Sequence, residues 1–148
     1  MKMISSLKTH LLIMLALILM AMQQSPVESL VLADGPVVIT NKIPGALTIH
    51  CVSSAGNDLG IQTRQLDGKF SWNVKLVAGK GSDVYRCDLA SGGLRGSFNL
   101  FDGRRDFAPD RCGLKDFLCL WEVRPDGIYL YHSIGDRHYF DLQYSWPR

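Results

Sequence analysis

The sequence lacks an excess of charge of either sign, and it has no second long apolar run beyond its N-terminus. Its 16 basic and 14 acidic residues give a formal net charge of +2. A protein that binds nucleic acid needs a clustered basic excess, which this chain does not have. We therefore expect no nucleic-acid partner, and no insertion into a membrane once the N-terminal segment has been removed.

The one apolar run lies at residues 11–20, between a basic flank that contains Lys2 and Lys8 and a polar stretch. It is shorter than the roughly 20 residues that a membrane-spanning helix needs. A basic flank followed by a short apolar core is typical of a secretory signal peptide. We predict such a peptide over residues 1–29, with cleavage after Ser29 or after Ala33 within the range 25–33. An uncleaved signal anchor is the alternative.

Cleavage after Ser29 leaves one mature domain, residues 30–148, which has room for one hydrophobic core. The leader removes Lys2, Lys8 and Glu28, so that the mature chain carries a formal charge of +1. We expect this domain to be secreted and to reside in the extracellular space.

Cysteine is scarce, and no two cysteines form the close CxxC pair of a structural zinc site. The four cysteines, all in the predicted mature domain, are Cys51, Cys87, Cys112 and Cys119. An even number in an exported chain indicates two disulfides. Four cysteines permit three pairings, and the sequence does not decide between them; we favour Cys51–Cys119 with Cys87–Cys112.

No segment of the mature chain has the pattern of a long amphipathic helix, and only residues 107–117 have room for one helical turn. The clearest pattern is a β-hairpin in which Cys119, Trp121 and Val123 share one face of a strand. Residues 124–127 (RPDG) form its turn and residues 128–132 its second strand. We expect Trp121 to lie in the core.

Similar strand-like runs recur along the mature chain, with turn residues between them. Several short strands at this spacing are typical of an antiparallel sandwich or barrel. The predicted fold is all-β, a small antiparallel β-sandwich stapled by two disulfides, with a polar loop from Asp102 to Lys115. The runs are residues 37–41, 47–51, 60–66, 70–76, 84–89, 96–101 and 139–146.

The sequence offers no constellation for catalysis, a cofactor or a metal. The mature histidines, His50, His132 and His138, do not accompany a free thiol, because the cysteines are assigned to disulfides. Asp102, Asp106 and Asp110 lack the regular spacing of an EF-hand loop, and arginines separate them. We therefore predict that the protein is not an enzyme and holds no cofactor or metal.

Several motifs of the mature chain occur together: residues 37–41 (VVITN), His50 with Cys51, residues 57–60 (NDLG), Trp72, residues 85–87 (YRC), Phe98, residues 102–106, Cys112, and residues 119–129 with the pattern CxWxVxxDGIY. In this set of motifs the chain resembles the plant self-incompatibility protein family, the S-protein homologues. The resemblance covers essentially the whole mature chain. The chain departs from the family pattern at residues 79–82 (GKGS), where a fuller stretch that contains aromatic residues and threonine is usual.

The resemblance implies a small secreted β-sandwich with two intrachain disulfides. The founding members are stigma-expressed ligands that trigger calcium-dependent rejection of self pollen. By this resemblance we expect a secreted signalling ligand that binds a plasma-membrane receptor protein and is itself a monomer. The alternative is an apoplastic defence protein or a module that binds a glycan or small molecule, for which Trp146 beside Tyr144 would form the stacking surface.

A ligand of this kind would contact its receptor through its loops, where arginine and aromatic side chains supply most of the binding energy. The favoured patch combines Leu94 and Arg95 with the segment 102–107, and a second patch lies at residues 57–58. The candidate partner-binding residues are Asn57, Asp58, Asp102, Arg104, Arg105 and Asp106.

Overall fold

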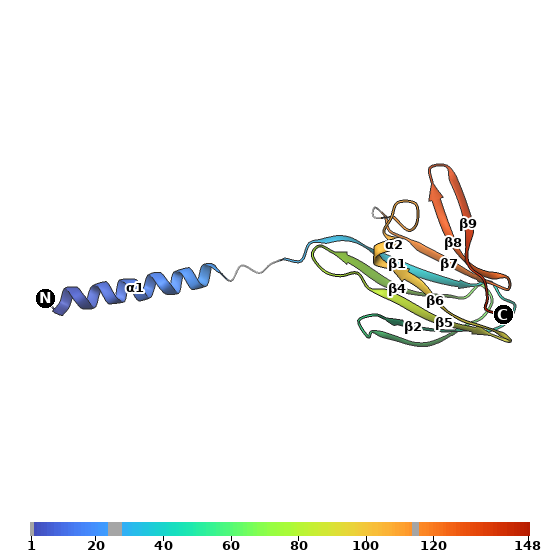
Figure 1. Cartoon of the computed structure of the whole chain (residues 1–148), viewed down its shortest axis with the longest axis horizontal. Helices are drawn as coiled ribbons and strands as arrows, with labels where there is room; N and C mark the ends of the chain where they lie inside the picture. The colour runs from blue at the N-terminus through green and yellow to red at the C-terminus, as the bar shows by residue number, and fades with distance from the viewer. Residues whose placement is uncertain (1, 24–27, 114–115) are drawn as a thin grey trace.

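The computed structural model describes residues 2–23, 28–113 and 116–148. Its elements are an N-terminal helix, nine strands and one short helix among these residues (Figure 1). In chain order they are α1 (Lys2–Met22), β1 (Val31–Asn41), β2 (Leu47–Ser53), β3 (Asp58–Arg64), β4 (Lys69–Val77), β5 (Val84–Ser91), β6 (Leu94–Asp102), α2 (Gly103–Asp106), β7 (Cys119–Arg124), β8 (Gly127–Ile134) and β9 (Arg137–Tyr144).

Helix α1 has no buried residue and lies apart from the strands (Figure 1). Its 21 residues extend beyond the apolar run at 11–20, so the helix is long and apolar enough to cross a membrane. The helix is therefore longer than the apolar run alone. A signal sequence near the N-terminus passes the same test, so α1 is compatible with a signal peptide. Residues 25–27 of the predicted cleavage range lie outside the described residues.

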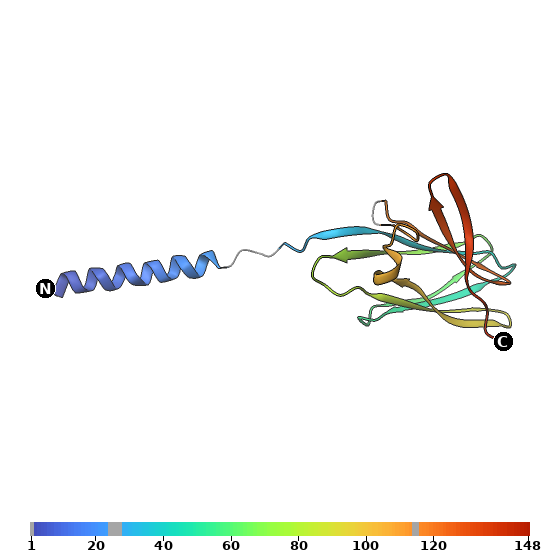
Figure 2. The same ribbon diagram turned by 45° about the horizontal axis from the view of Figure 1, so that its top comes forward.

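The strands form two sheets that face each other (Figure 2). Sheet A has the strand order β4-β1-β7-β8-β9, and sheet B the order β3-β2-β5-β6. This confirms the predicted β-sandwich. One pairing differs from the expected antiparallel arrangement, because β1 and β7 run parallel with Ile39 opposite Trp121. These strands are far apart in sequence, so no hairpin constrains their relative direction.

The core fills the space between the sheets with residues of alternate parity, as strand geometry requires. Trp121 is completely buried at its centre, as predicted. In strands β2, β4, β5 and β7, the alternate residues predicted to face inward are buried or half-buried, as predicted. Fully or almost fully buried apolar side chains include Val37, Ile39, Leu47, Ile49, Leu89, Leu100, Phe101, Trp121, Val123, Ile128 and Leu130.

The two disulfides are Cys51–Cys87 and Cys112–Cys119, so the favoured pairing was wrong. Cys51 and Cys87 lie directly opposite each other on the adjacent strands β2 and β5. Cys119, by contrast, is on β7 of the other sheet. The cysteines on adjacent strands thus form the disulfide. Which strands are adjacent depends on the strand order in the sheet, and the alternation of apolar and polar residues does not reveal that order.

The segment expected to be a polar loop contains both a helical turn and core residues. The turn is α2, at Gly103–Asp106, rather than within 107–117. Phe107 follows it and is buried against the rings of Phe101 and Phe117. Lys115, the predicted end of the loop, lies outside the described residues.

Candidate partner-binding surface

Three segments meet at one end of sheet B, which we call the α2 end: residues 54–58, 78–83 and 102–106. Hydrogen bonds connect them in the order in which the strands lie side by side. The Ser54 amide donates to the Val84 carbonyl oxygen over 2.8 Å, and the Gly103 amide donates to the Asp83 carbonyl oxygen over 3.0 Å. The two candidate segments of the sequence, 57–58 and 102–106, therefore lie at the same end of the molecule.

Leu94 and Arg95 lie elsewhere. They begin β6, whereas Asp102 ends it, and β6 is a nine-residue strand. A strand of this length separates its ends by roughly 3.3 Å per residue. The structure therefore does not bring Arg95 together with the segment at 102–107, and the favoured patch divides into two separate sites.

Asn57 and Asp58 are exposed in a β2–β3 turn whose own hydrogen bonds hold its shape. The Ser53 hydroxyl oxygen accepts from the Asn57 amide over 3.1 Å. Asp58 Oδ1 accepts from the Gly60 amide over 2.8 Å and lies 2.8 Å from His50 Nε2. The Gly60 hydrogen bond and then that of His50 hold the pKa of the Asp58 carboxyl below its ordinary value. Asp58 is therefore an exposed, fixed negative charge.

Arg104 is the most exposed member of the α2 segment, with 79% of its side chain accessible. Asp102 caps the turn, because its Oδ1 accepts from the Arg104 amide over 2.9 Å. Gly103 packs so closely on Ser82 of the β4–β5 loop that a Cβ at this position would overlap it. The turn is thus held at both sides. The Arg104 guanidinium is largely exposed, with its Nε 3.6 Å from Asp102 Oδ1.

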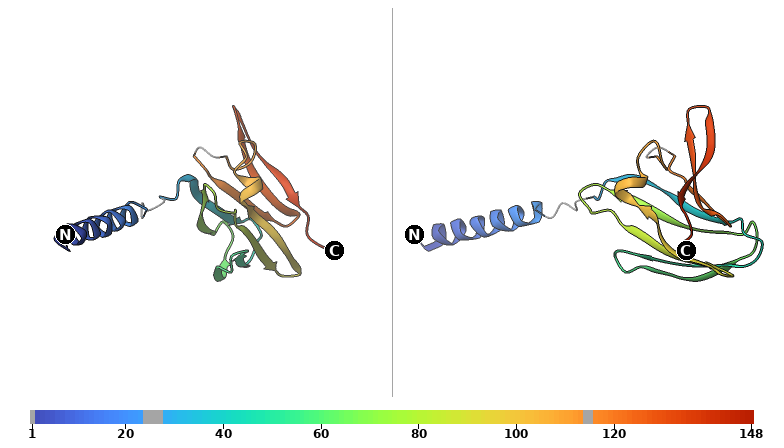
Figure 3. Two further views of the ribbon diagram at one scale, coloured as in Figure 1. Left: turned by 60° about the vertical axis from the view of Figure 1, so that its left-hand side comes forward. Right: turned by 45° about the vertical axis from the view of Figure 1, so that its right-hand side comes forward.

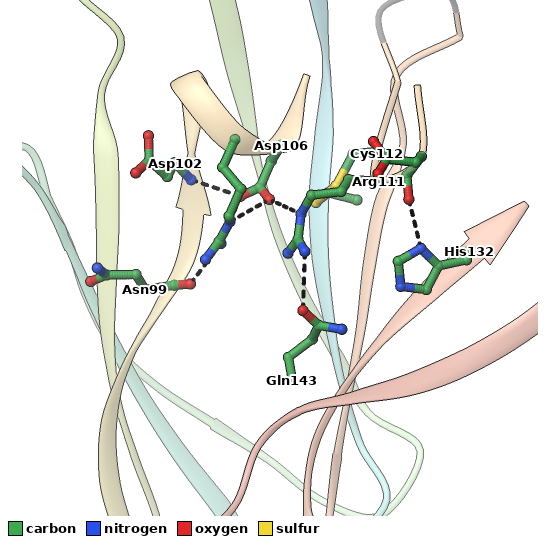
Figure 4. The surroundings of a disulfide bond; sticks show 10 residues. Asn99, Asp102, Asp106, Arg111, Cys112, His132 and Gln143 are labelled. Atoms are coloured by element: carbon green, nitrogen blue, oxygen red, sulfur yellow. Dashed lines mark hydrogen bonds and ion pairs between the residues drawn. A yellow bond between two sulfur atoms is a disulfide. The ribbon is translucent and has the colours of Figure 1, made fainter. Parts of the chain in front are cut away.

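Asp106 is not available to a partner, because its side chain is completely buried. Its carboxylate accepts hydrogen bonds from the Asp102 amide over 2.7 Å, from Arg105 Nε over 2.8 Å and from Arg111 Nε over 2.7 Å (Figure 4). A buried carboxylate needs such compensation. The structure therefore corrects the interpretation of Asp106 as a contact residue: it holds α2 in place.

Arg105 has the same structural role and is only partly exposed. Its guanidinium donates to the Tyr144 hydroxyl over 2.9 Å and to the Asn99 carbonyl oxygen over 3.0 Å. Burial opposes the charge of Arg105, but attraction to Asp106 and hydrogen bonding to Asp106 and Tyr144 outweigh it, so its pKa is raised. Arg105 therefore ties α2 to β6 and β9 rather than to a partner.

Arg111 is the functional neighbour that the sequence analysis missed. It completes the charge pairing of Asp106 and donates to Gln143 Oε1 over 3.0 Å. The next residue, Cys112, donates its amide to the Asp106 carbonyl oxygen and forms the disulfide to Cys119 (Figure 4). The mixed-charge sequence around Arg111 does not show that its side chain turns inward to Asp106, and its other partner, Gln143, is 32 residues away.

The stacking surface considered for a glycan does not form. Trp146 packs against the ring of Phe98 and donates from Nε1 to the Arg124 carbonyl oxygen over 2.9 Å. Tyr144 also packs on Phe98, and its hydroxyl donates to the Asn99 carbonyl oxygen. Both side chains thus close the seam between β6 and β9 instead of presenting ring faces to solvent.

The histidines do not converge on one site. His50 pairs with Asp58, His132 Nδ1 lies 2.9 Å from the Asp110 carbonyl oxygen, and His138 Nδ1 lies 2.9 Å from the Tyr131 hydroxyl. Within residues 2–23, 28–113 and 116–148, no group of three or more His, Cys, Asp or Glu residues is placed to hold a metal ion.

The sequence was compared with known protein families and curated proteins. The profile described as plant self-incompatibility protein S1 matches residues 36–146. S-protein homolog 4 of Arabidopsis thaliana is 29% identical over 112 residues, which cover 74% of this chain and 70% of the relative. S-protein homolog 6 of the same plant is 32% identical over 111 residues, which cover 74% of each chain. The matched region spans the sandwich from β1 to the C-terminal segment, and the chain belongs to the plant self-incompatibility protein S1 family.

Proposed function

We propose that this protein is a secreted signalling ligand that binds a plasma-membrane receptor protein from the extracellular space of plant tissue, the apoplast. Family membership supports a secreted, signalling-like protein. The apolar N-terminal helix and the two disulfides support export, because disulfides persist in oxidising compartments. The receptor contact is the α2 end.

The observation that carries this proposal is the convergence of Asn57, Asp58 and Arg104. They come from two segments far apart in sequence, and their side chains point into solvent from turns held by internal hydrogen bonds. Binding through a preorganised surface loses less conformational entropy than binding through a flexible one. Arginine is also the side chain most suited to bidentate contact with a carboxylate.

A hollow between β4 and the β4–β5 loop offers a place for a receptor side chain, and the loop is joined to the α2 segment by the hydrogen bond from the Gly103 amide to the Asp83 carbonyl oxygen. The hollow has a volume of about 370 Å³, and the buried rings of Tyr85 and Phe101 contribute to its wall. Lys80, Gly81 and Asp83 of the β4–β5 loop line its rim. Interface residues that contribute most to affinity commonly insert into such pockets, surrounded by polar contacts.

A matched pair of arginine substitutions tests the location of the contact. Arg104 and Arg95 are exposed arginines near opposite ends of β6, so Arg104→Ala and Arg95→Ala remove the same charge. We measure saturable binding of wild type and of each purified single variant to plant plasma-membrane vesicles. The double variant that combines Asn57→Ala and Arg104→Ala is measured in the same way. Thermal melts accompany each measurement, because surface substitutions of this kind change stability by less than about 0.5 kcal/mol.

We expect Arg104→Ala to weaken binding by about tenfold or more, the double variant to weaken it further, and Arg95→Ala to leave it unchanged. Binding should also disappear after protease treatment of the vesicles. Equal binding by wild type and the Arg104 variants would overturn the assignment of the α2 end. Binding that survives protease but not removal of glycans would overturn the protein receptor in favour of a glycan.

A further inference from the structure

Strands β8 and β9 form a hairpin whose tip stands away from the rest of the sandwich, as the views in Figures 1 and 3 agree. β9 is the last strand of sheet A, and among the described residues it pairs only with β8. Its outer edge therefore presents backbone donors and acceptors that no strand of this chain satisfies. Such an edge is a template for pairing with another chain.

The free part of this edge is its N-terminal half. Arg137, His138, Tyr139 and Asp141 are exposed, whereas Tyr144 is half-buried by its contacts with Asn99 and Phe98. Large apolar side chains accompany the free edge: Tyr139 and Leu142 are each 44% accessible. The strand contains neither proline nor lysine. Its edge protection consists of the inward-pointing charges of Arg137 and Asp141 and of a register shift near its C-terminal end, and a partner strand that pairs these charges would remove the first of these obstacles.

The register with β8 defines which β9 side chains share a face. Arg137, Tyr139 and Asp141 lie opposite Ile134, His132 and Leu130, respectively, and so point to the core side of sheet A. The alternate residues, His138 and Phe140, point to the outer side. Charges of opposite sign thus stand two residues to either side of Tyr139.

Two copies of β9 can pair antiparallel only about a two-fold axis perpendicular to the sheet, which places residues of the same parity opposite each other. If Tyr139 lies opposite its own copy, Arg137 lies opposite Asp141 of the second copy. The two-fold axis repeats this pair, so the interface contains two such pairs. The outer face then brings His138 opposite Phe140. Opposite charges and aromatic pairs at these positions stabilise a sheet.

The other registers are less favourable. Placing Arg137 or Asp141 opposite its own copy opposes two like charges, which destabilises the pairing. Placing Phe140 opposite its own copy sets Tyr139 against Asp141 and Arg137 against Gln143, so no opposite charges meet. Placing His138 opposite its own copy sets Arg137 against Tyr139 and Asp136 against Phe140, so no opposite charges meet in that register either. The charges on this edge therefore select one register and disfavour its neighbours.

We propose that this protein self-associates through antiparallel pairing of β9 with β9 of a second copy, centred on Tyr139, to form one continuous sheet across the dimer. The interface is small, so the association is weak and depends on concentration. This replaces the expectation of a strict monomer. It uses a surface separate from the segments of the α2 end and does not depend on the receptor proposal.

A charge exchange tests the register. Sedimentation equilibrium of the secreted, disulfide-bonded protein between about 10 µM and about 1 mM covers the range in which a small interface associates. We expect Asp141→Arg to weaken dimerisation about tenfold, because two attractive pairs become repulsive. Arg137→Asp should do the same, and the double exchange should restore wild-type affinity. Ile61→Arg, which places an arginine on the exposed edge strand β3, should have no effect.

A cysteine cross-link tests the contact directly. Opposite residues in an antiparallel pair have Cα atoms about 4.5–5.5 Å apart, which a disulfide can span. Tyr139→Cys should therefore give a covalent dimer on mild oxidation, whereas Leu142→Cys, which is equally exposed and on the other face, should not. A single monomeric mass over the whole concentration range would overturn the proposal. A dimer that is indifferent to both charge exchanges would also overturn it.

Discussion

Asp106 and Arg111 form an ion pair in which the carboxylate is completely buried and lies 2.7 Å from the arginine Nε. Arg105 contacts the same carboxylate over 2.8 Å, so two guanidinium groups share one negative charge. The group joins β6, α2 and the segment before β7 (Figure 4). It determines where α2 sits and hence where Arg104 points.

Replacing Asp106 by Ala should destabilise the protein by about 3–5 kcal/mol, because two partly buried guanidinium groups lose their counter-ion. Chemical denaturation of the variant, compared with wild type, measures this cost. The control is Asp67→Asn, which removes an exposed carboxylate that pairs with Lys42 at the surface and keeps a residue type that tolerates the positive φ of position 67. Exposed pairs contribute little to stability. Equal effects of the two substitutions would show that the buried position of Asp106 does not matter.

Trp121 should be a stability residue whose ring matters and whose indole N–H does not. The side chain is completely buried, and its Nε1 has no hydrogen-bond partner among the described residues. Trp121→Ala should cost about 3–5 kcal/mol through the cavity that it leaves. Trp121→Phe should cost clearly less, because it removes no hydrogen bond and leaves a smaller cavity. Unfolding curves decide this; a similar loss in both variants would indicate that Nε1 makes a structural contact.

The β-hairpin and the inward faces of several strands could be predicted from sequence, because alternation is local. Cys119, Trp121 and Val123 share a buried face as their parity indicates. The disulfide pairing could not be predicted in the same way. Cys51 meets Cys87 only because β2 lies beside β5, and that neighbourhood depends on the packing of the whole sheet.

The candidate site was predictable only for its exposed members. Asn57, Asp58 and Arg104 have the turn-forming context that local sequence indicates. Asp106 has the same mixed-charge context, yet it is buried. Arg111, five residues later in the chain, pairs with its carboxylate there. The sequence of the loop contains Arg111 but does not show which of its arginines turns inward, so Asp106 was expected to contact a partner.

Removal of His50 should raise the pKa of Asp58 toward its ordinary value without fully restoring it. The Gly60 amide is the larger cause of the lowered pKa, and His50 is the second. Because the folded pKa is depressed, the charged form contributes stability above the ordinary pKa of about 3.8 and loses it as the pH falls through the folded value. NMR titration of the carboxyl in wild type and His50→Ala tests this. No change of pKa would remove His50 as a cause, and full restoration would remove Gly60.

The mature protein should begin at Leu30, because cleavage after Ala33 would remove the start of β1. The Leu30 carbonyl oxygen accepts from the Ala78 amide over 2.9 Å, and Val31 pairs with Val77. Ala33 is buried, so its loss would also expose core surface. N-terminal sequencing of protein from culture medium measures the site. As a control, a chain started at residue 34 should melt at a lower temperature than one started at residue 30. A secreted protein that begins at Asp34 with equal stability would contradict the role assigned to these residues.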